Sequence, residues 1–87
     1  MPVSETHVLR LLAERMKALR RAKEWSQEQL AEHSTMQRSY LADLERGNRN
    51  PSVRTLLKIA NALGVTVPAL FEEPGPDRPR TTAKDRR

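Results

Sequence analysis

The side chains of this chain that could do chemistry are cations and hydrogen-bonding amides and hydroxyls. Gln37, Arg38 and Ser39 follow one another directly, and a second polar stretch reads Asn-Arg-Asn at residues 48–50. Arginine bonds bidentately to the O6 and N7 atoms of guanine, and amides and hydroxyls pair with base edges or phosphates. These residue types suit the recognition of a nucleic acid.

The sequence lacks the residue patterns that are typical of catalytic sites and metal sites. No nucleophile has a base beside it, no glycine-rich loop could cradle a phosphate, and no carboxylate pair stands out. The chain holds no cysteine, and its two histidines, His7 and His33, lie far apart without partner ligands. We therefore expect no enzyme, no metal site and no cofactor.

The charge balance favours a polyanionic partner. Sixteen Lys and Arg against 11 Asp and Glu give a net charge of +5, and a basic excess points first to nucleic acid. Residues 74–87 hold five basic and two acidic residues, so the total charge does not place a binding face on the rest. No apolar run approaches the roughly 18 residues of a membrane span, so we expect a cytoplasmic protein with no membrane partner.

The length of 87 residues allows one domain. We expect this domain at residues 1–73 and a disordered basic tail at residues 74–87, which opens with the sequence PGPDRP. A core of this size is marginally stable, and dimerisation is the usual remedy where disulfides and metals are absent.

Helical periodicity and capping residues predict an all-α domain of five helices. The first spans about Thr6–Lys23, with Ser4 or Thr6 as its cap. The second begins after Ser26 and ends near Ser34. Its start combines a capping box and a hydrophobic staple, formed by Ser26 with Gln29 and by Trp25 with Leu30.

Three further helices complete the prediction. The third spans about Gln37–Arg46 and stops at Gly47. The fourth follows the cap Ser52 and ends at Gly64, and the last is a short turn from Thr66 to Phe71. The fourth helix should bury an apolar stripe that consists of Val53, Leu56, Leu57, Ala60 and Leu63.

The sequence resembles the phage-repressor and Cro-like helix-turn-helix family from about Leu11 to Phe71. The resemblance is carried by SQEQLAE from Ser26, RSYLADLERG from Arg38, RNPS from Arg49, TLLKIANALGV from Thr55 and ALF from Ala69. It implies a five-helix repressor-like fold in which the second and third helices form the motif. The implied function is sequence-specific binding of double-stranded DNA by a transcription regulator.

Two residues depart from the family pattern. The family usually has glycine in the turn between the second and third helices, where this chain has Thr35. It also usually has glycine just before Trp25, where this chain has Glu24. A β-branched residue is poorly suited to positive φ, so we expect a local adjustment of the turn within the same fold.

The resemblance also implies roles for individual side chains. The third helix would enter the major groove with its first residues against base edges. The predicted base contacts are Gln37, Arg38, Ser39 and Asp43. The predicted phosphate contacts are Gln27, Tyr40, Asn48, Arg49 and Asn50. Asp43 could instead hold Arg38 or Arg46 in place, and Tyr40 could be simply a core residue.

Two structural roles follow from the same resemblance. Arg20 and Glu45 match positions that form a buried ion pair, which would tie the first helix to the third. A dimer would read two half-sites about 34 Å apart on a palindromic operator. Val67, Leu70 and Phe71 either complete the core or form the surface of a homodimer.

Several functional subtypes remain open. The motif from Arg38 to Ser52 also resembles the controller proteins of restriction-modification systems, and an antitoxin that represses its own operon is a further subtype. A helical protein-interaction module that does not bind DNA is the rival from another class. Neutralising acids around Gln27, Arg38 and Arg49 would favour that rival.

Overall fold

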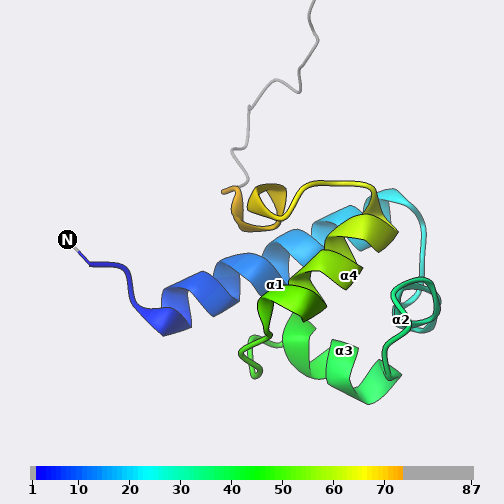
Figure 1. Ribbon diagram of the computed structural model, residues 1–87, viewed down its shortest axis with the longest axis horizontal. Coiled ribbons are helices and arrows are strands. Elements are labelled where there is room, and N and C mark those ends of the chain that lie inside the picture. Colours follow the sequence, from blue (N-terminus) through cyan, green and yellow to red (C-terminus); the bar gives the residue numbers. More distant parts are fainter. Residues whose placement is uncertain (1, 74–87) are drawn as a thin grey trace, which may run out of the picture.

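The computed structural model describes residues 2–73, and this part of the chain is helical without a strand. It contains four α-helices and one 3-10 turn (Figure 1). The elements are α1 (Glu5–Ala22), α2 (Gln27–His33), α3 (Arg38–Glu45), α4 (Val53–Leu63) and η1 (Pro68–Phe71). The predicted all-α class is confirmed, and the predicted tail at residues 74–87 lies outside the described residues.

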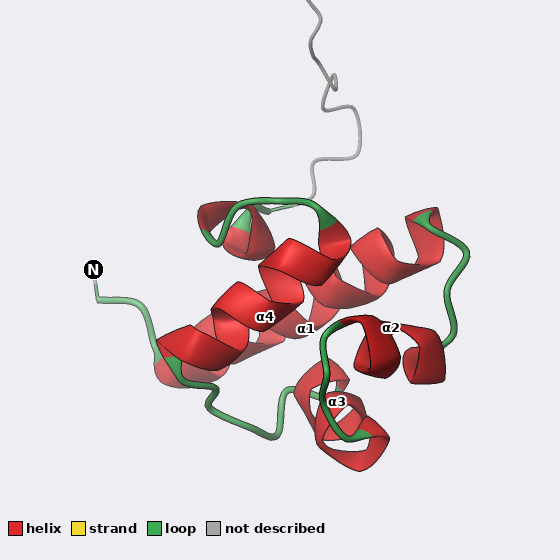
Figure 2. Ribbon diagram, turned by 45° about the vertical axis from the view of Figure 1, so that its right-hand side comes forward, coloured by secondary structure: helices red, strands yellow, loops and turns green. Residues whose placement is uncertain are grey.

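The helices pack around α1, the longest of them. Both η1 and α3 contact α1, and in Figure 1 η1 lies above it and α3 below it. α2 contacts both α3 and α4. Figure 2 shows α2 and α3 side by side, joined by a short loop, which is the arrangement of the predicted two-helix motif.

Capping side chains set three of the helix starts, those of α1, α2 and α4, where the caps are Ser4, Ser26 and Ser52. Ser4 caps α1, with its hydroxyl accepting from the backbone N–H of His7 at 3.0 Å, so Ser4 rather than Thr6 is the cap. At α2 the predicted capping box is present: Ser26 Oγ accepts from the Gln29 N–H at 3.1 Å, and Gln29 Oε1 accepts from the Ser26 N–H at 2.8 Å. These bonds satisfy amide groups that a helix start leaves without partners.

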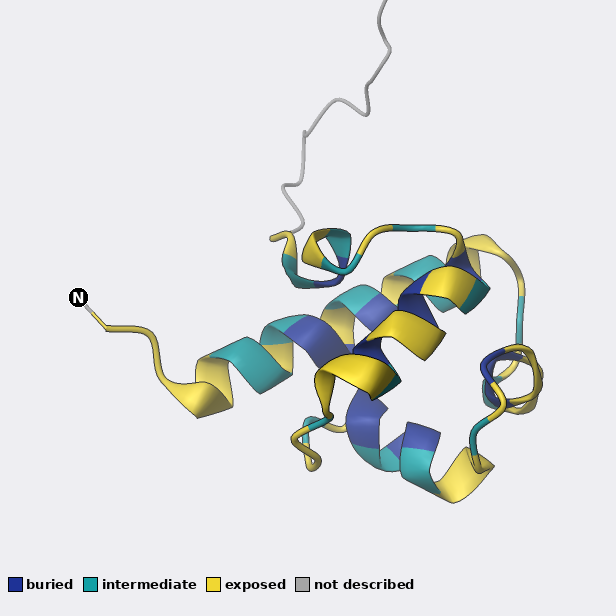
Figure 3. Cartoon of the chain, in the orientation of Figure 1, coloured by how far each residue is buried: buried dark blue, intermediate teal, exposed yellow. Residues whose placement is uncertain are grey.

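The core lies between the four α-helices and η1 (Figure 3). Its buried residues are Leu12, Met16, Leu30, Ala31, Leu41, Leu44, Leu56, Ile59, Ala60, Leu63 and Leu70.

The burial predicted for the apolar stripe of α4 was wrong for two residues on one side of the stripe. Val53 and Leu57 are 69% and 48% exposed, whereas Ile59 is fully buried. The predicted stripe and the residues that are in fact buried both recur at helical spacing. Spacing alone therefore does not decide which of two neighbouring faces of the helix is buried. Packing into the core, where α4 contacts α2, turns the face of Leu56, Ile59 and Leu63 inward and leaves the Val53 and Leu57 side chains outside.

The predicted fifth helix is a single 3-10 turn. Pro68 occupies its first position, and the turn ends at Phe71. Arg15 of α1 holds it: Arg15 Nε donates to the Ala69 carbonyl at 2.9 Å, and its Nη2 lies 3.3 Å from Glu72 Oε1. Leu70 is fully buried by this docking.

The burial of Leu70 corrects its assignment to a dimer surface. A side chain with no exposed area inside one chain has none to offer to a second chain, so the core alternative holds for Leu70. Val67 and Phe71 are half-buried and pack against the same core.

The two departures from the family pattern adopt left-handed backbone. Glu24, between α1 and α2, has a φ of 60°, and Thr35, between α2 and α3, has a φ of 52°. The turns therefore keep a shape that glycine adopts at low cost, and these two residues adopt it at a cost in steric strain. Thr35 Oγ1 donates to the Ser34 carbonyl at 2.6 Å.

Replacing Thr35 by glycine should stabilise the protein. The change removes the Cβ that makes a left-handed residue unfavourable, so we expect the free energy of unfolding to rise by about 1 kcal/mol. For a domain of this size that corresponds to a Tm increase of about 4–8 °C in thermal unfolding followed by circular dichroism. Thr35→Ala is the matched control, since it loses the same hydroxyl but keeps Cβ, and it should gain much less. A Tm below that of the wild type for Thr35→Gly would contradict the assignment of strain.

Candidate nucleic-acid interface

The start of α3 presents three polar side chains to solvent. Gln37, Arg38 and Ser39 are all exposed (Figure 3). Gln37 is the N-cap residue, but its side chain makes no capping hydrogen bond. The burial of Leu41 and Leu44 holds the opposite face of the helix in the core. The fold thus anchors α3 by one face and leaves its first turn outside.

A buried ion pair fixes α3 against α1. Arg20 Nε lies 2.7 Å from Glu45 Oε2, and Arg20 Nη2 donates to Glu45 Oε1 at 3.0 Å. The side chains are only 11% and 2% exposed. Arg20 Nη1 also donates to the Trp25 carbonyl at 2.8 Å, so one guanidinium joins α1, the segment before α2 and the end of α3. The pair inferred from the resemblance is present in the structure.

Gln27 connects this ion pair to the start of α3. Its Nε2 donates to Glu45 Oε1 at 3.0 Å, and its Oε1 accepts from Arg38 Nη1 at 3.4 Å. Gln27 is half-buried, whereas Arg38 is exposed. Sequence reasoning missed this connection, because its residues come from three helices and only the packing of those helices brings them together.

The loop after α3 forms a second polar cluster. Arg49 lies over the ring of Tyr40, with its Cζ atom 5.0 Å from the ring centroid. Asp43 pairs with Arg46, and its Oδ2 lies 3.5 Å from Arg49 Nε. Tyr40 is half-buried against the core. This geometry supports the alternative in which Asp43 holds Arg46 in place, and it extends that role to Arg49, whereas Arg38 is held by Gln27.

Asn50 is turned toward the first helix. Its Nδ2 donates to Glu5 Oε2 at 3.1 Å, and both residues are exposed. Asn48 is exposed as well. Asn48 and Asn50 thus place exposed amide groups on either side of Arg49 along the chain.

Acidic residues lie close to these cations. Arg38 shares an open surface hollow of about 490 Å³ with Glu28 and Glu32 of α2. At the loop, the cations of Arg46 and Arg49 face the carboxylate of Asp43, and the carboxylate of Glu5 lies against Asn50. Carboxylates therefore outnumber the cation at the start of α3, whereas the two signs are equal in number at the loop.

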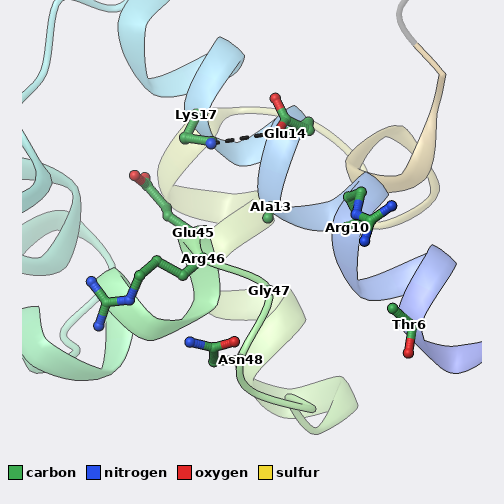
Figure 4. Close-up of a pocket in the computed structure, with 9 residues that line it drawn as sticks. All are labelled: Thr6, Arg10, Ala13, Glu14, Lys17, Glu45, Arg46, Gly47 and Asn48. Atoms are coloured by element: carbon green, nitrogen blue, oxygen red, sulfur yellow. Dashed lines mark hydrogen bonds and ion pairs between the residues drawn. The ribbon is translucent and has the colours of Figure 1, made fainter.

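A separate hollow of about 500 Å³ lies between α1 and the end of α3. It is lined by Thr6, Arg10, Ala13, Glu14, Lys17, Glu45, Arg46, Gly47 and Asn48 (Figure 4). Lys17 and Glu14 pair across its rim at 3.5 Å, and the Arg46 guanidinium points away from Arg10. Glu45 is paired with Arg20, so the cations Arg10, Lys17 and Arg46 outnumber the remaining carboxylate of Glu14 in this hollow.

Within residues 2–73, no helix is both long and apolar enough to cross a membrane. In the same part of the chain, no group of three or more His, Cys, Asp or Glu side chains is arranged to hold a metal ion.

Comparison with known proteins matches this geometry to a family. The helix-turn-helix family model matches residues 16–70. The immunity repressor protein of Bacillus phage phi105 is 47% identical over 62 residues, which make up 71% of this chain and 43% of that repressor. The chain therefore spans less than half the length of this relative.

Solved structures agree with the match. The restriction-modification controller protein C.AhdI from Aeromonas hydrophila superposes with a TM-score of 0.70 at 44% identity, covering 72% of this chain and 96% of that one. The N-terminal DNA-binding domain of SinR from Bacillus subtilis gives a TM-score of 0.69 at 35% identity, covering 74% and 94% of the two chains.

Removing the carboxylate of the buried ion pair should destabilise the fold. Glu45→Ala leaves the Arg20 guanidinium buried without its partner, so we expect a loss of about 3–5 kcal/mol in the free energy of unfolding. That is a large part of the stability of a small domain. Urea unfolding of the full chain measures the loss. Glu14→Ala, which removes an exposed pair with Lys17, is the control and should change stability little. An unchanged midpoint for Glu45→Ala would refute the structural role.

Proposed function

This chain belongs to the helix-turn-helix family, and from that premise we propose that it is a sequence-specific DNA-binding regulator of transcription. The exposed first turn of α3 carries the proposal, because it offers Gln37, Arg38 and Ser39 on a helix whose other face is anchored in the core. A helix presented in this way fits the major groove of B-DNA, where each base pair has a distinct pattern of donors and acceptors. Such a regulator acts in the cytoplasm of a bacterial cell.

We assign base reading to the start of α3 and phosphate binding to the following loop. Arg38 has the fork geometry that pairs with guanine O6 and N7. Asn48, Arg49 and Asn50 offer amide donors and one cation to a DNA strand, with Tyr40 beneath Arg49. Phosphate contacts of this kind fix the register, whereas base contacts specify the sequence.

The rival function, a helical protein-interaction module, would be favoured by neutralising acids at this surface. Glu28 and Glu32 together outnumber the charge of Arg38 in the hollow that they share, which is a point in favour of the rival. At the loop, Arg46 and Arg49 face Asp43, and Glu5 lies against Asn50, so the local charge does not separate the two functions. The match to the helix-turn-helix family and the guanidinium of Arg38 at the exposed start of α3 support DNA rather than a protein partner.

The relatives suggest the kind of regulator. One is a phage immunity repressor and another is a restriction-modification controller protein. We propose a repressor, with a restriction-modification controller or an antitoxin that represses its own operon as subtypes. Selection of binding sites from random duplex DNA would identify the operator, and enrichment of no sequence at all would argue against the proposed function.

Arg38→Ala should relax sequence preference at one base pair. The loss of a bidentate contact should cost about 1–3 kcal/mol on the selected site and less on random duplexes. Fluorescence anisotropy over a set of single-base-pair variants measures both. Arg49→Ala is the comparison, since a lost phosphate contact should weaken all duplexes alike and reduce the salt slope by about 1. A uniform loss for Arg38→Ala would reassign Arg38 to a phosphate.

We further propose that the protein acts as a homodimer on a pseudo-palindromic operator. Among residues 2–73 the exposed large apolar side chains are Val3, Val53 and Leu57, and the last two lie one turn apart on α4. Apolar side chains that neighbour each other on a surface mark interaction sites more often than scattered ones. We therefore propose that the seam includes Val53 and Leu57 of α4, with the half-buried Val67 and Phe71 as further candidates.

Leu57→Asp should convert the dimer into a monomer. A charge at the centre of an apolar seam stays desolvated on both copies, which is costly. Sedimentation equilibrium of the full chain measures the change in mass. Val3→Asp makes the same chemical change at an exposed site outside the helices and should leave the dimer intact. If Leu57→Asp stays dimeric while Phe71→Asp is a folded monomer, the seam lies at η1 instead.

A further inference from the structure

We propose that the hollow between α1 and the end of α3 is a second binding site for DNA phosphates, with Arg10 and Lys17 of α1 as its cations. We name this surface the α1 hollow. The inference rests on the proposed function and extends the DNA contact to a helix outside the two-helix motif. The phosphates belong to the strand that we assign to the loop of residues 48–50.

The α1 hollow carries an excess of positive charge that the rest of the proposed interface lacks. Carboxylates outnumber the cation at the start of α3, and the two signs are equal in number at the loop. In the α1 hollow, Arg10, Lys17 and Arg46 outnumber the carboxylate of Glu14, since Glu45 already belongs to the buried ion pair. A surface with excess cations attracts a polyanion and releases the counterions condensed on it.

The two cations of α1 are available to a ligand. Arg10 is exposed, and within residues 2–73 its guanidinium makes no hydrogen bond or ion pair. The Lys17 side chain is 28% exposed, and its Nζ lies 3.5 Å from the carboxylate of Glu14, which is 60% exposed. An exposed pair of this length contributes little to stability. A phosphate can therefore bind both cations without breaking a contact that holds the fold.

The α1 hollow adjoins the loop to which we assign phosphate binding. Gly47 and Asn48 form one of its sides, and Asn48 is the first residue of that loop (Figure 4). On the opposite side, Arg10 and Lys17 flank Ala13, whose small, buried side chain leaves the space between them open. Seven helical residues span about 10 Å, so the two cations can reach different phosphates of one strand.

The construction of the α1 hollow suits a chain of phosphates better than a single small anion. The backbone N–H groups of Gly47 and Asn48 already donate to carbonyls of α3, at 3.0 and 2.9 Å. The Arg46 guanidinium points away from Arg10, so the cations do not converge on one point (Figure 4). Separated cations on long side chains are typical of contacts to DNA backbone, which position the protein without reading sequence.

Salt titration of operator binding by the full chain tests this inference. Arg10→Gln and Lys17→Gln should each weaken binding about tenfold at 0.1 M salt, on the operator and on random duplexes alike, and reduce the salt slope by about 1. The double variant should reduce it by about 2. Lys58→Gln is the matched control, because it removes the same charge from an exposed position on α4 that does not line the α1 hollow. It should leave the slope nearly unchanged.

Neutral methylphosphonate linkages, placed one at a time along the operator, locate the contact. A linkage at the α1 hollow should weaken binding of the wild type but have almost no effect on Arg10→Gln, because the cation that it would meet is already gone. Linkages that are coupled to Arg10 should neighbour those coupled to Arg49, since the α1 hollow adjoins the loop. Additive losses at every linkage would overturn the inference.

Two further outcomes identify what has failed. Saturable shifts of the Gly47 and Asn48 amide signals with micromolar inorganic phosphate, measured by nuclear magnetic resonance, would assign the α1 hollow to a free anion and overturn the inference. A wild type that binds the operator with a salt slope matched by both α1 variants would overturn the inference and keep the proposed function. A wild type that binds no duplex even at low salt would refute the proposed function and this inference together.

Discussion

The Arg20–Glu45 ion pair is the contact on which the other parts of this structure depend. One guanidinium, nearly buried, bonds to both oxygens of Glu45 and to the Trp25 carbonyl. It therefore fixes the end of α3 and the entry to α2 to the same point on α1. A buried charge pair of this kind adds little net stability compared with an apolar contact, but its geometry is specific. The relative placement of the two motif helices follows from that geometry.

The surface built on this frame combines two kinds of chemistry. At the start of α3, acids on α2 lie near Arg38, so charge alone attracts a polyanion only weakly there. At the loop, Arg49 lies on Tyr40 beside Asp43. Under the proposed function, nonspecific attraction would fall to the loop and the α1 hollow and selectivity to Arg38. That division suits a regulator that must distinguish one site among many.

Local sequence signals predicted the fold well where a local interaction decides the structure. The capping box of Ser26 and Gln29 and the left-handed Gly64 at the end of α4 fixed helix boundaries from neighbouring residues alone. Burial was harder to predict. Val53, Leu57 and Ile59 all fit a helical stripe, and Leu70 fits either a core or a surface, because tertiary packing rather than spacing decides which side faces inward.

The candidate site shows the same division. Its residues were recognisable from the motif, including Arg38 and the Arg20–Glu45 pair. The link from Glu45 through Gln27 to Arg38 was not, because it joins both ends of α3 through a side chain of α2 whose rotamer no local pattern specifies. Asp43 likewise pairs with Arg46 and Arg49, and not with Arg38.

The two residues with left-handed backbone that flank α2 affect which substitutions this sequence can tolerate during evolution. Glu24 and Thr35 each sit in a backbone conformation that glycine adopts freely. Small domains lie close to a stability threshold, so most substitutions that alter specificity risk unfolding the chain. Substitution by glycine at either position would compensate for a loss of stability elsewhere in the fold without changing the core or the surface of α3. Relief of strain at these two turns would therefore allow α3 to accept substitutions that alone would destabilise the fold.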